Sequence, residues 1–131
     1  MLTLLQAQQA VTTAIETATN NNQQVAVAVC DTHGELIAFA KMDEVSVQAG
    51  LLAKSKAYTS ARDRQPSGNL GEWARVTGKD ISYWNDPNIT GFKGGVPILS
   101  QGRVVGAIGI SGLSEEEDES LAQLSISELS L

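Results

Sequence analysis

Apolar residues recur at helical spacing in the first part of the chain. They fall on one face of a helix, and they are Leu4, Ala7, Val11, Ala14, Ile15 and Ala18. Thr3 and Gln6 have the spacing of a capping box, in which each side chain binds a free amide of the first turn. The polar run Asn20-Asn21-Asn22 breaks the pattern. The sequence therefore predicts an amphipathic helix that begins at Thr3 and ends at this run.

Two short apolar runs follow and predict a β-hairpin. They cover residues 25–30 and 35–41 and are joined by Asp31-Thr32-His33-Gly34, a typical turn composition. The first run consists of Val and Ala up to Cys30 and has no polar face. Because such a strand is buried on both sides, we expect helices on both faces of its sheet.

A second hairpin is predicted from residues 94–99 and 103–110, joined by Ser100-Gln101-Gly102. Pro97 has no amide hydrogen for a strand ladder, so its strand is expected at a sheet edge or at a bulge. Gly106, Gly109 and Gly112 recur at three-residue spacing. Since glycine weakens a strand, we expect another part of the molecule to lie close to this backbone.

Two further helices are predicted. In residues 45–62 an alanine recurs at every fourth position, and this narrow stripe indicates packing against the sheet; it comprises Ala49, Ala53, Ala57 and Ala61. Ser114 is the expected cap of the last helix. The acidic block 115–119 follows it, where the positive end of the helix dipole favours negative charge. The simplest interpretation of this block is a solvated helix start.

Residues 65–92 lack a regular pattern apart from a short predicted helix over 70–76. Both tryptophans of the chain, Trp73 and Trp84, lie here. They either line a flat hydrophobic ligand or pin the loop to the core, and the second is the simpler expectation. A long connection of this kind inside a compact domain is often functional.

Composition and charge narrow the functional classes. The chain has 131 residues, 42% of them hydrophobic, which predicts one soluble globular domain over residues 1–131. The net charge of −6 argues against binding to duplex nucleic acid or to an anionic membrane surface. No apolar run is long enough to span a membrane. With a single cysteine and no charged leader segment, the expected location is cytoplasmic.

The sequence shows no recognisable catalytic constellation and no metal-site pattern. The glycine series lies within a strand and precedes an acidic block, which does not fit a dinucleotide-binding turn. Residues 109–113 differ from a nucleophile elbow because Leu113 replaces its last glycine. One cysteine and one histidine do not make a zinc site.

Single residues therefore carry the ligand-binding hypotheses. His33 is a candidate axial ligand to a haem iron, since imidazole is the usual choice. Met42, Lys56 and Tyr58 are the other candidates of this kind. Their simpler interpretations are a solvated turn residue for His33, packing residues for Met42 and Tyr58, and a surface charge for Lys56.

Four blocks in order carry a resemblance to a known family. They are residues 25–43, the segment Lys56-Ala57-Tyr58-Thr59-Ser60-Ala61, residues 94–98 and residues 105–112, with Asp118 on the last helix. Together they resemble the GlcG/HbpS-like family, which includes the C-terminal domain of PduO-type corrinoid adenosyltransferases. The resemblance implies an α+β, profilin-like fold, an antiparallel sheet with helices packed on both faces, and a homo-oligomer.

The same resemblance implies two functions of different classes. One is a cytoplasmic, oligomeric small-molecule binding protein with haem or another tetrapyrrole as ligand. The alternative is a non-catalytic accessory protein of glycolate or diol metabolism that acts through protein contacts. Haem degradation follows from the resemblance alone. The candidate ligand-binding residues are His33, Met42, Lys56, Tyr58, Trp73 and Trp84.

Overall fold

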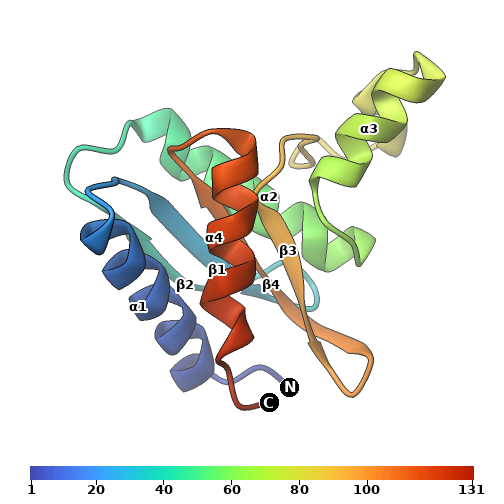
Figure 1. Ribbon diagram of the computed structural model, residues 1–131. Coiled ribbons are helices and arrows are strands. Elements are labelled where there is room, and N and C mark those ends of the chain that lie inside the picture. The colour runs from blue at the N-terminus through green and yellow to red at the C-terminus, as the bar shows by residue number, and fades with distance from the viewer.

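A computed structural model describes all 131 residues and shows an α+β fold (Figure 1). Its antiparallel sheet has four strands in the order β2-β1-β4-β3. Helices α1 and α4 cover one face of the sheet and α2 covers the other. The elements are α1 (Leu4–Asn20), β1 (Ala26–Asp31), β2 (Leu36–Lys41), α2 (Val47–Asp63), α3 (Gly68–Thr77), the short 3-10 helix η1 (Ile81–Trp84), β3 (Gly95–Ser100), β4 (Arg103–Ser111) and α4 (Glu115–Ser127). The predicted antiparallel sheet between two helical layers is confirmed.

Strand β1 is buried on both faces, as its uniform apolar sequence predicts. Val27 and Val29 belong to the core under α1 and α4. Ala26, Ala28 and Cys30 belong to a smaller core under α2. Because these three side chains are short, α2 lies close to the sheet.

Glycines of the sheet bring α2 still closer. A Cβ atom on Gly109 would collide with the backbone carbonyl oxygen of Ala53, and one on Gly95 with that of Lys56. Ala53 and Ala57 of the predicted stripe are buried at this contact. The expected close approach to the glycine-containing strand is therefore confirmed, and at Gly109 the approaching segment is the backbone of α2.

The strand edges and helix starts also agree with the sequence. Strand β3 is an edge strand, and its register with β4 shifts just after Pro97, between Ile98 and Leu99. Complete capping boxes begin α1, at Thr3, and α4, at Ser114. None of the helices combines the length and the apolar character needed to cross a membrane.

In residues 66–92, named the arm here, α3 and η1 project away from the sheet and its covering helices (Figure 1), whereas the ends of the arm bond to α2 and β3. Trp73 and Trp84 lie in the arm with ring centroids 5.5 Å apart in an edge-to-face arrangement. Neither belongs to a core cluster, and Trp84 is 38% exposed. The expectation that they pin the loop to the core is therefore wrong, because the two rings pack against each other.

Candidate functional site

A pocket of about 680 Å³ lies at one end of the sheet. The β1–β2 turn, the β3–β4 turn and the C-terminus of α2 meet there, because β1 and β4 are antiparallel neighbours that pair Asp31 with Gly106. We name it the His33 pocket. Its volume is in the usual range for small-molecule sites. The lining residues are Thr32, His33, Ala61, Arg64, Leu99, Gly102, Arg103 and Val104.

The backbone of His33 is held on both sides. Oδ1 of Asp31 accepts hydrogen bonds from the amides of His33, at 2.8 Å, and Glu35, at 3.0 Å. Nη1 of Arg62 donates to the carbonyl oxygen of His33 at 3.0 Å. The imidazole itself is exposed and makes no hydrogen bond within the chain. A fixed backbone and a free imidazole give His33 the properties of a ligand-binding side chain.

The Tyr58 ring packs against Gly34 of the same turn. Gly34 adopts a φ of 86°, and its missing side chain makes room for the Tyr58 ring. The Tyr58 hydroxyl donates to Oδ2 of Asp86 in the arm at 2.6 Å. This hydrogen bond raises the pKa of Tyr58 and lowers the pKa of Asp86. The structure thus brings the candidates Tyr58 and His33 together and links both to the arm.

Arg62 completes this link. Its guanidinium lies over the Tyr58 ring, 5.0 Å from the centroid, and its Nε is 3.7 Å from Oδ2 of Asp86. Since Arg62 also binds the His33 carbonyl, one side chain joins the turn, α2 and the arm. Asp86 and Arg62 escaped the sequence analysis because only the fold brings them to His33.

The walls of the His33 pocket are of two kinds. Ala61, Leu99 and Val104 are apolar, whereas Arg64 and Arg103 are cationic, and no carboxylate is among the lining residues. Such a pocket can take a ligand with an apolar body and an anionic edge. The free imidazole adds a nitrogen donor of the type that holds haem iron.

Lys56 is buried, so its interpretation as a surface charge is wrong. Its Nζ donates to Oδ2 of Asp118 at 3.0 Å and to the carbonyl oxygen of Ile110 at 2.9 Å. Oδ1 of Asp118 accepts from the Leu113 amide at 3.0 Å. Burial raises the pKa of Asp118, and the Lys56 ammonium opposes that rise. The pair joins α2 to α4, and the Lys56 side chain is not accessible to a ligand.

Asp118 also corrects the interpretation of the acidic block as a solvated helix start. It is 2% exposed, whereas Glu115, Glu116 and Glu119 of the same block keep contact with solvent. A signal was present in the helix periodicity, because Asp118 shares its face with Leu121, Ala122 and Ser125, which are also buried.

The remaining candidates lie away from the His33 pocket. Met42 follows β2 at the opposite end of the sheet, where its sulfur accepts a hydrogen bond from the Val25 amide at 3.4 Å. It packs against both core clusters. Trp73 and Trp84 lie in the arm. Of the six candidates, His33 alone lines the pocket.

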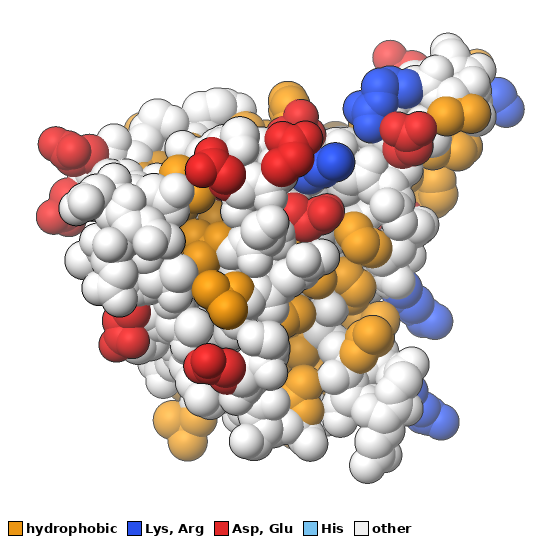
Figure 2. Space-filling model, in the orientation of Figure 1, with side chains coloured by type: hydrophobic (Ala, Val, Ile, Leu, Met, Phe, Trp, Pro, Cys, Tyr) orange, Lys and Arg blue, Asp and Glu red, His pale blue; other side chains and the backbone are white.

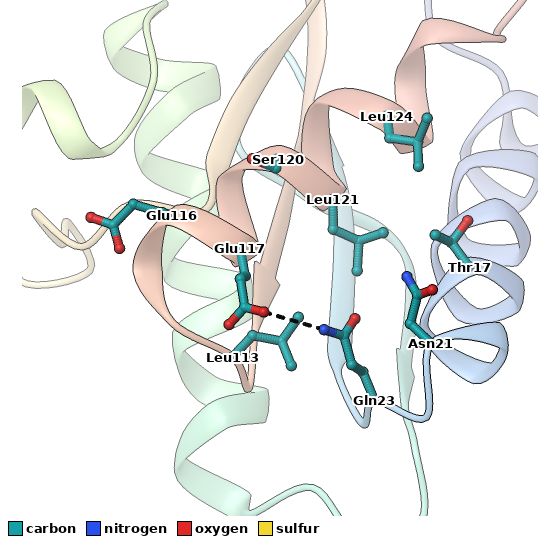
Figure 3. Close-up of a pocket in the computed structure, with 9 residues that line it drawn as sticks. All are labelled: Thr17, Asn21, Gln23, Leu113, Glu116, Glu117, Ser120, Leu121 and Leu124. Carbon is teal, nitrogen blue, oxygen red and sulfur yellow. Dashed lines mark hydrogen bonds between the residues drawn. The ribbon is translucent and has the colours of Figure 1, made fainter.

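A second pocket differs in charge. It has a volume of about 320 Å³, lies between the C-terminal part of α1 and α4, and is shown in Figure 3. Glu116 and Glu117 line it, and Nε2 of Gln23 lies 3.4 Å from Oε2 of Glu117. Apolar atoms are visible between the two helices in Figure 2. With two carboxylates and no cation in its lining, this pocket does not favour an anionic ligand.

The structure contains no cluster of metal-binding side chains, and its single thiol is buried. No three side chains of the His, Cys, Asp and Glu types lie close enough together to hold a metal ion. Cys30 is buried in β1, and burial raises the pKa of its thiol to about 12. It is therefore a neutral packing residue at physiological pH.

Comparisons with known proteins agree with the fold. A family model described as "Haem degrading protein HbpS-like" matches residues 2–127. Protein GlcG of Escherichia coli K12 is 33% identical over 96 residues, which are 73% of this chain and 70% of GlcG.

Two solved structures are similar over nearly the whole chain. A double mutant of HbpS from Streptomyces reticuli superposes with a TM-score of 0.90 and 27% identity, covering 99% of this chain and 88% of that one. A structure described as a PduOC:heme complex gives a TM-score of 0.88 and 25% identity, covering 98% and 96% of the two chains. The second shows this fold in a protein that carries haem.

Proposed function

Because the chain belongs to the HbpS-like family, we propose that it binds haem or another tetrapyrrole in the His33 pocket. One observation carries this proposal. The chain's single histidine, whose imidazole has no hydrogen-bond partner within the chain, lines a pocket of about 680 Å³ with both apolar and cationic walls.

The residues present fit the group. His33 would hold the iron through its free imidazole, and the hydrogen bonds of Asp31 and Arg62 keep its backbone in place. Leu99 and Val104 offer apolar contact to a flat ring. A bound haem would supply a redox-active iron centre. The haem-bound PduOC structure and the description of the family support this assignment.

A haemin titration followed by absorption spectroscopy tests the proposal. We expect a saturable shift of the Soret band with one site per chain, and we expect His33→Ala to lose that shift. Met42→Leu is the matched control, because Met42 lies at the opposite end of the sheet and its replacement should leave the titration unchanged. A linear response like that of free haemin would overturn the proposal.

A second candidate function is an accessory protein that acts through protein contacts, and the arm favours it. Three large apolar side chains are strongly exposed there: Val76 at 74%, Tyr83 at 69% and Phe92 at 51%. Exposed apolar groups gathered on one projection are typical of a protein-binding surface. Specific co-purification of a partner that Val76→Gln releases would support this function, and self-association alone would count against it.

Three further inferences from the sequence stay predictions. They are the organisation as one domain over residues 1–131, the assembly into a homo-oligomer and the cytoplasmic location. The oligomer is tested by measuring the mass in solution in the buffer of the haemin titration.

A further inference from the structure

We propose that Arg64 and Arg103 make the His33 pocket a receptor for two carboxylates on one edge of its ligand. This inference rests on the proposed function, because it names the part of the tetrapyrrole that the pocket recognises. Both arginines line the pocket. They belong to separate elements: Arg64 is the C-cap residue of α2, directly after Asp63, and Arg103 is the first residue of β4.

These two arginines differ from the other cations of the chain. The remaining seven each have a partner, which is a carboxylate, a carbonyl oxygen or an aromatic ring. Arg64 and Arg103 have no ion pair, no side-chain hydrogen bond and no aromatic partner within the chain. The two cations left free thus line the same pocket.

The charged side chains that line the pocket are positive, whereas the whole protein has a negative net charge. The chain carries 15 acidic and 9 basic residues, yet no acidic side chain lines the pocket. The acidic neighbours along the chain are engaged elsewhere: Asp31 accepts the turn amides, and Asp63 accepts from Nε2 of Gln65 at 2.7 Å. The positive potential of the two guanidinium groups is therefore available to a ligand.

Guanidinium chemistry defines the ligand class. A planar guanidinium binds a carboxylate through two parallel N–H···O hydrogen bonds, so two arginines match two carboxylates. Natural tetrapyrroles carry carboxylate side chains around the ring. A free dicarboxylic acid offers the same chemistry from another source, and the test has to separate the two.

The first experiment compares the binding of haemin with that of its dimethyl ester in one detergent-containing buffer. We expect haemin to bind at least about tenfold more tightly, because the ester removes both negative charges. Arg64→Gln and Arg103→Gln should each weaken haemin binding by about tenfold and leave binding of the ester unchanged. Lys79→Gln is the matched control, because Lys79 is a cation of the arm without a carboxylate partner.

The second experiment uses glutarate, a free dicarboxylate without a ring, and measures the midpoint of thermal unfolding. We expect millimolar glutarate to compete with haemin in the wild-type protein and not in the double variant Arg64→Gln/Arg103→Gln. Should neither ring compound bind while glutarate raises the wild-type midpoint alone, the tetrapyrrole function is overturned and the dicarboxylate site stands.

Two other results overturn the inference. Equal affinity of haemin and its ester, unaffected by the arginine substitutions, would refute the carboxylate receptor and leave the tetrapyrrole function intact. The absence of binding by haemin, ester and glutarate alike would refute both.

Discussion

The contact between α2 and the sheet and the attachment of the arm are built in opposite ways. Alpha-helix α2 touches the sheet backbone to backbone, over glycines, with alanines and a fully buried ion pair between the layers. The arm is attached mainly by polar contacts: Tyr58 donates to Asp86, Thr59 accepts from the Thr90 amide, and Ser67 accepts from the Gly95 amide.

This difference assigns the two regions different roles: the α2 contact stabilises the fold, and the arm can open locally beside the pocket. At Gly95 and Gly109 in the α2 contact no Cβ atom can be added without moving backbone, and cores of this kind respond strongly to single substitutions. The arm buries few large apolar side chains, so its local opening should need less free energy than global unfolding. The His33 pocket lies between the two, on a turn that α2 supports and that the arm reaches through Asp86 and Arg62.

The largest expected effect follows from breaking the buried ion pair. Lys56→Met leaves the carboxylate of Asp118 buried without its cation, and we expect a loss of about 4 kcal/mol in the free energy of unfolding. Denaturant unfolding measures it. The double variant Lys56→Met/Asp118→Leu removes both charges and should recover most of the loss. A single variant as stable as the wild type would show that the pair contributes nothing.

A slightly smaller effect is expected from filling the glycine contact. Gly109→Ala places a methyl group against the Ala53 carbonyl, which forces α2 away from the sheet, and we expect a loss of about 3 kcal/mol. Gly78→Ala is the control, since no atom lies near that position and its positive φ alone should cost about 1 kcal/mol. Equal losses in the two variants would contradict the close packing of α2.

A moderate effect is expected at the attachment of the arm. Asp86→Asn replaces the charged acceptor of the Tyr58 hydroxyl at a partly solvated site, and we expect a loss of about 1 kcal/mol. Since both tryptophans lie in the arm, their fluorescence reports on it directly. Tyr58→Phe should give a similar change, and unchanged fluorescence in both variants would exclude this attachment.

The same contact predicts a pH dependence. The folded-state pKa of Asp86 is lowered from its ordinary value of 3.8, so its contribution to stability is present above that value. It is lost as the pH falls through the lower folded-state value. We expect a change in tryptophan fluorescence in that acidic range in the wild-type protein and a smaller change in Asp86→Asn. Identical acid titrations would contradict the pKa shift.

The smallest effect on stability is expected at the exposed face of the arm. Val76 is 74% exposed, so Val76→Gln should change the free energy of unfolding by no more than about 0.5 kcal/mol. If another chain covers this face in solution, the same substitution should lower the measured mass of the assembly. Light scattering records the mass, and a large loss of stability in a monomeric protein would show that the side chain packs within its own chain.

Local patterns determined most of the architecture. Helical periodicity, short apolar runs, one capping box, the cap residue Ser114 and two turn sequences predicted α1, α2, α4 and both hairpins. The uniform apolar run of β1 predicted helices on both faces, and Pro97 predicted an edge strand. These features depend on residues close together in the chain, so the sequence carries them directly. The η1 helix was missed, since a four-residue turn leaves no periodic signal.

Tertiary structure alone decided which distant residues meet. Lys56 and Asp118 are 62 positions apart, and each was interpreted as solvated because charge outweighed periodicity in the sequence argument. Tyr58 and Asp86 meet only because the arm folds back along α2. The sequence singled out His33, but the pocket around it needs three separate segments brought to one end of the sheet. Such contacts depend on how the chain packs in space, so they cannot be predicted from the spacing of residues within one segment.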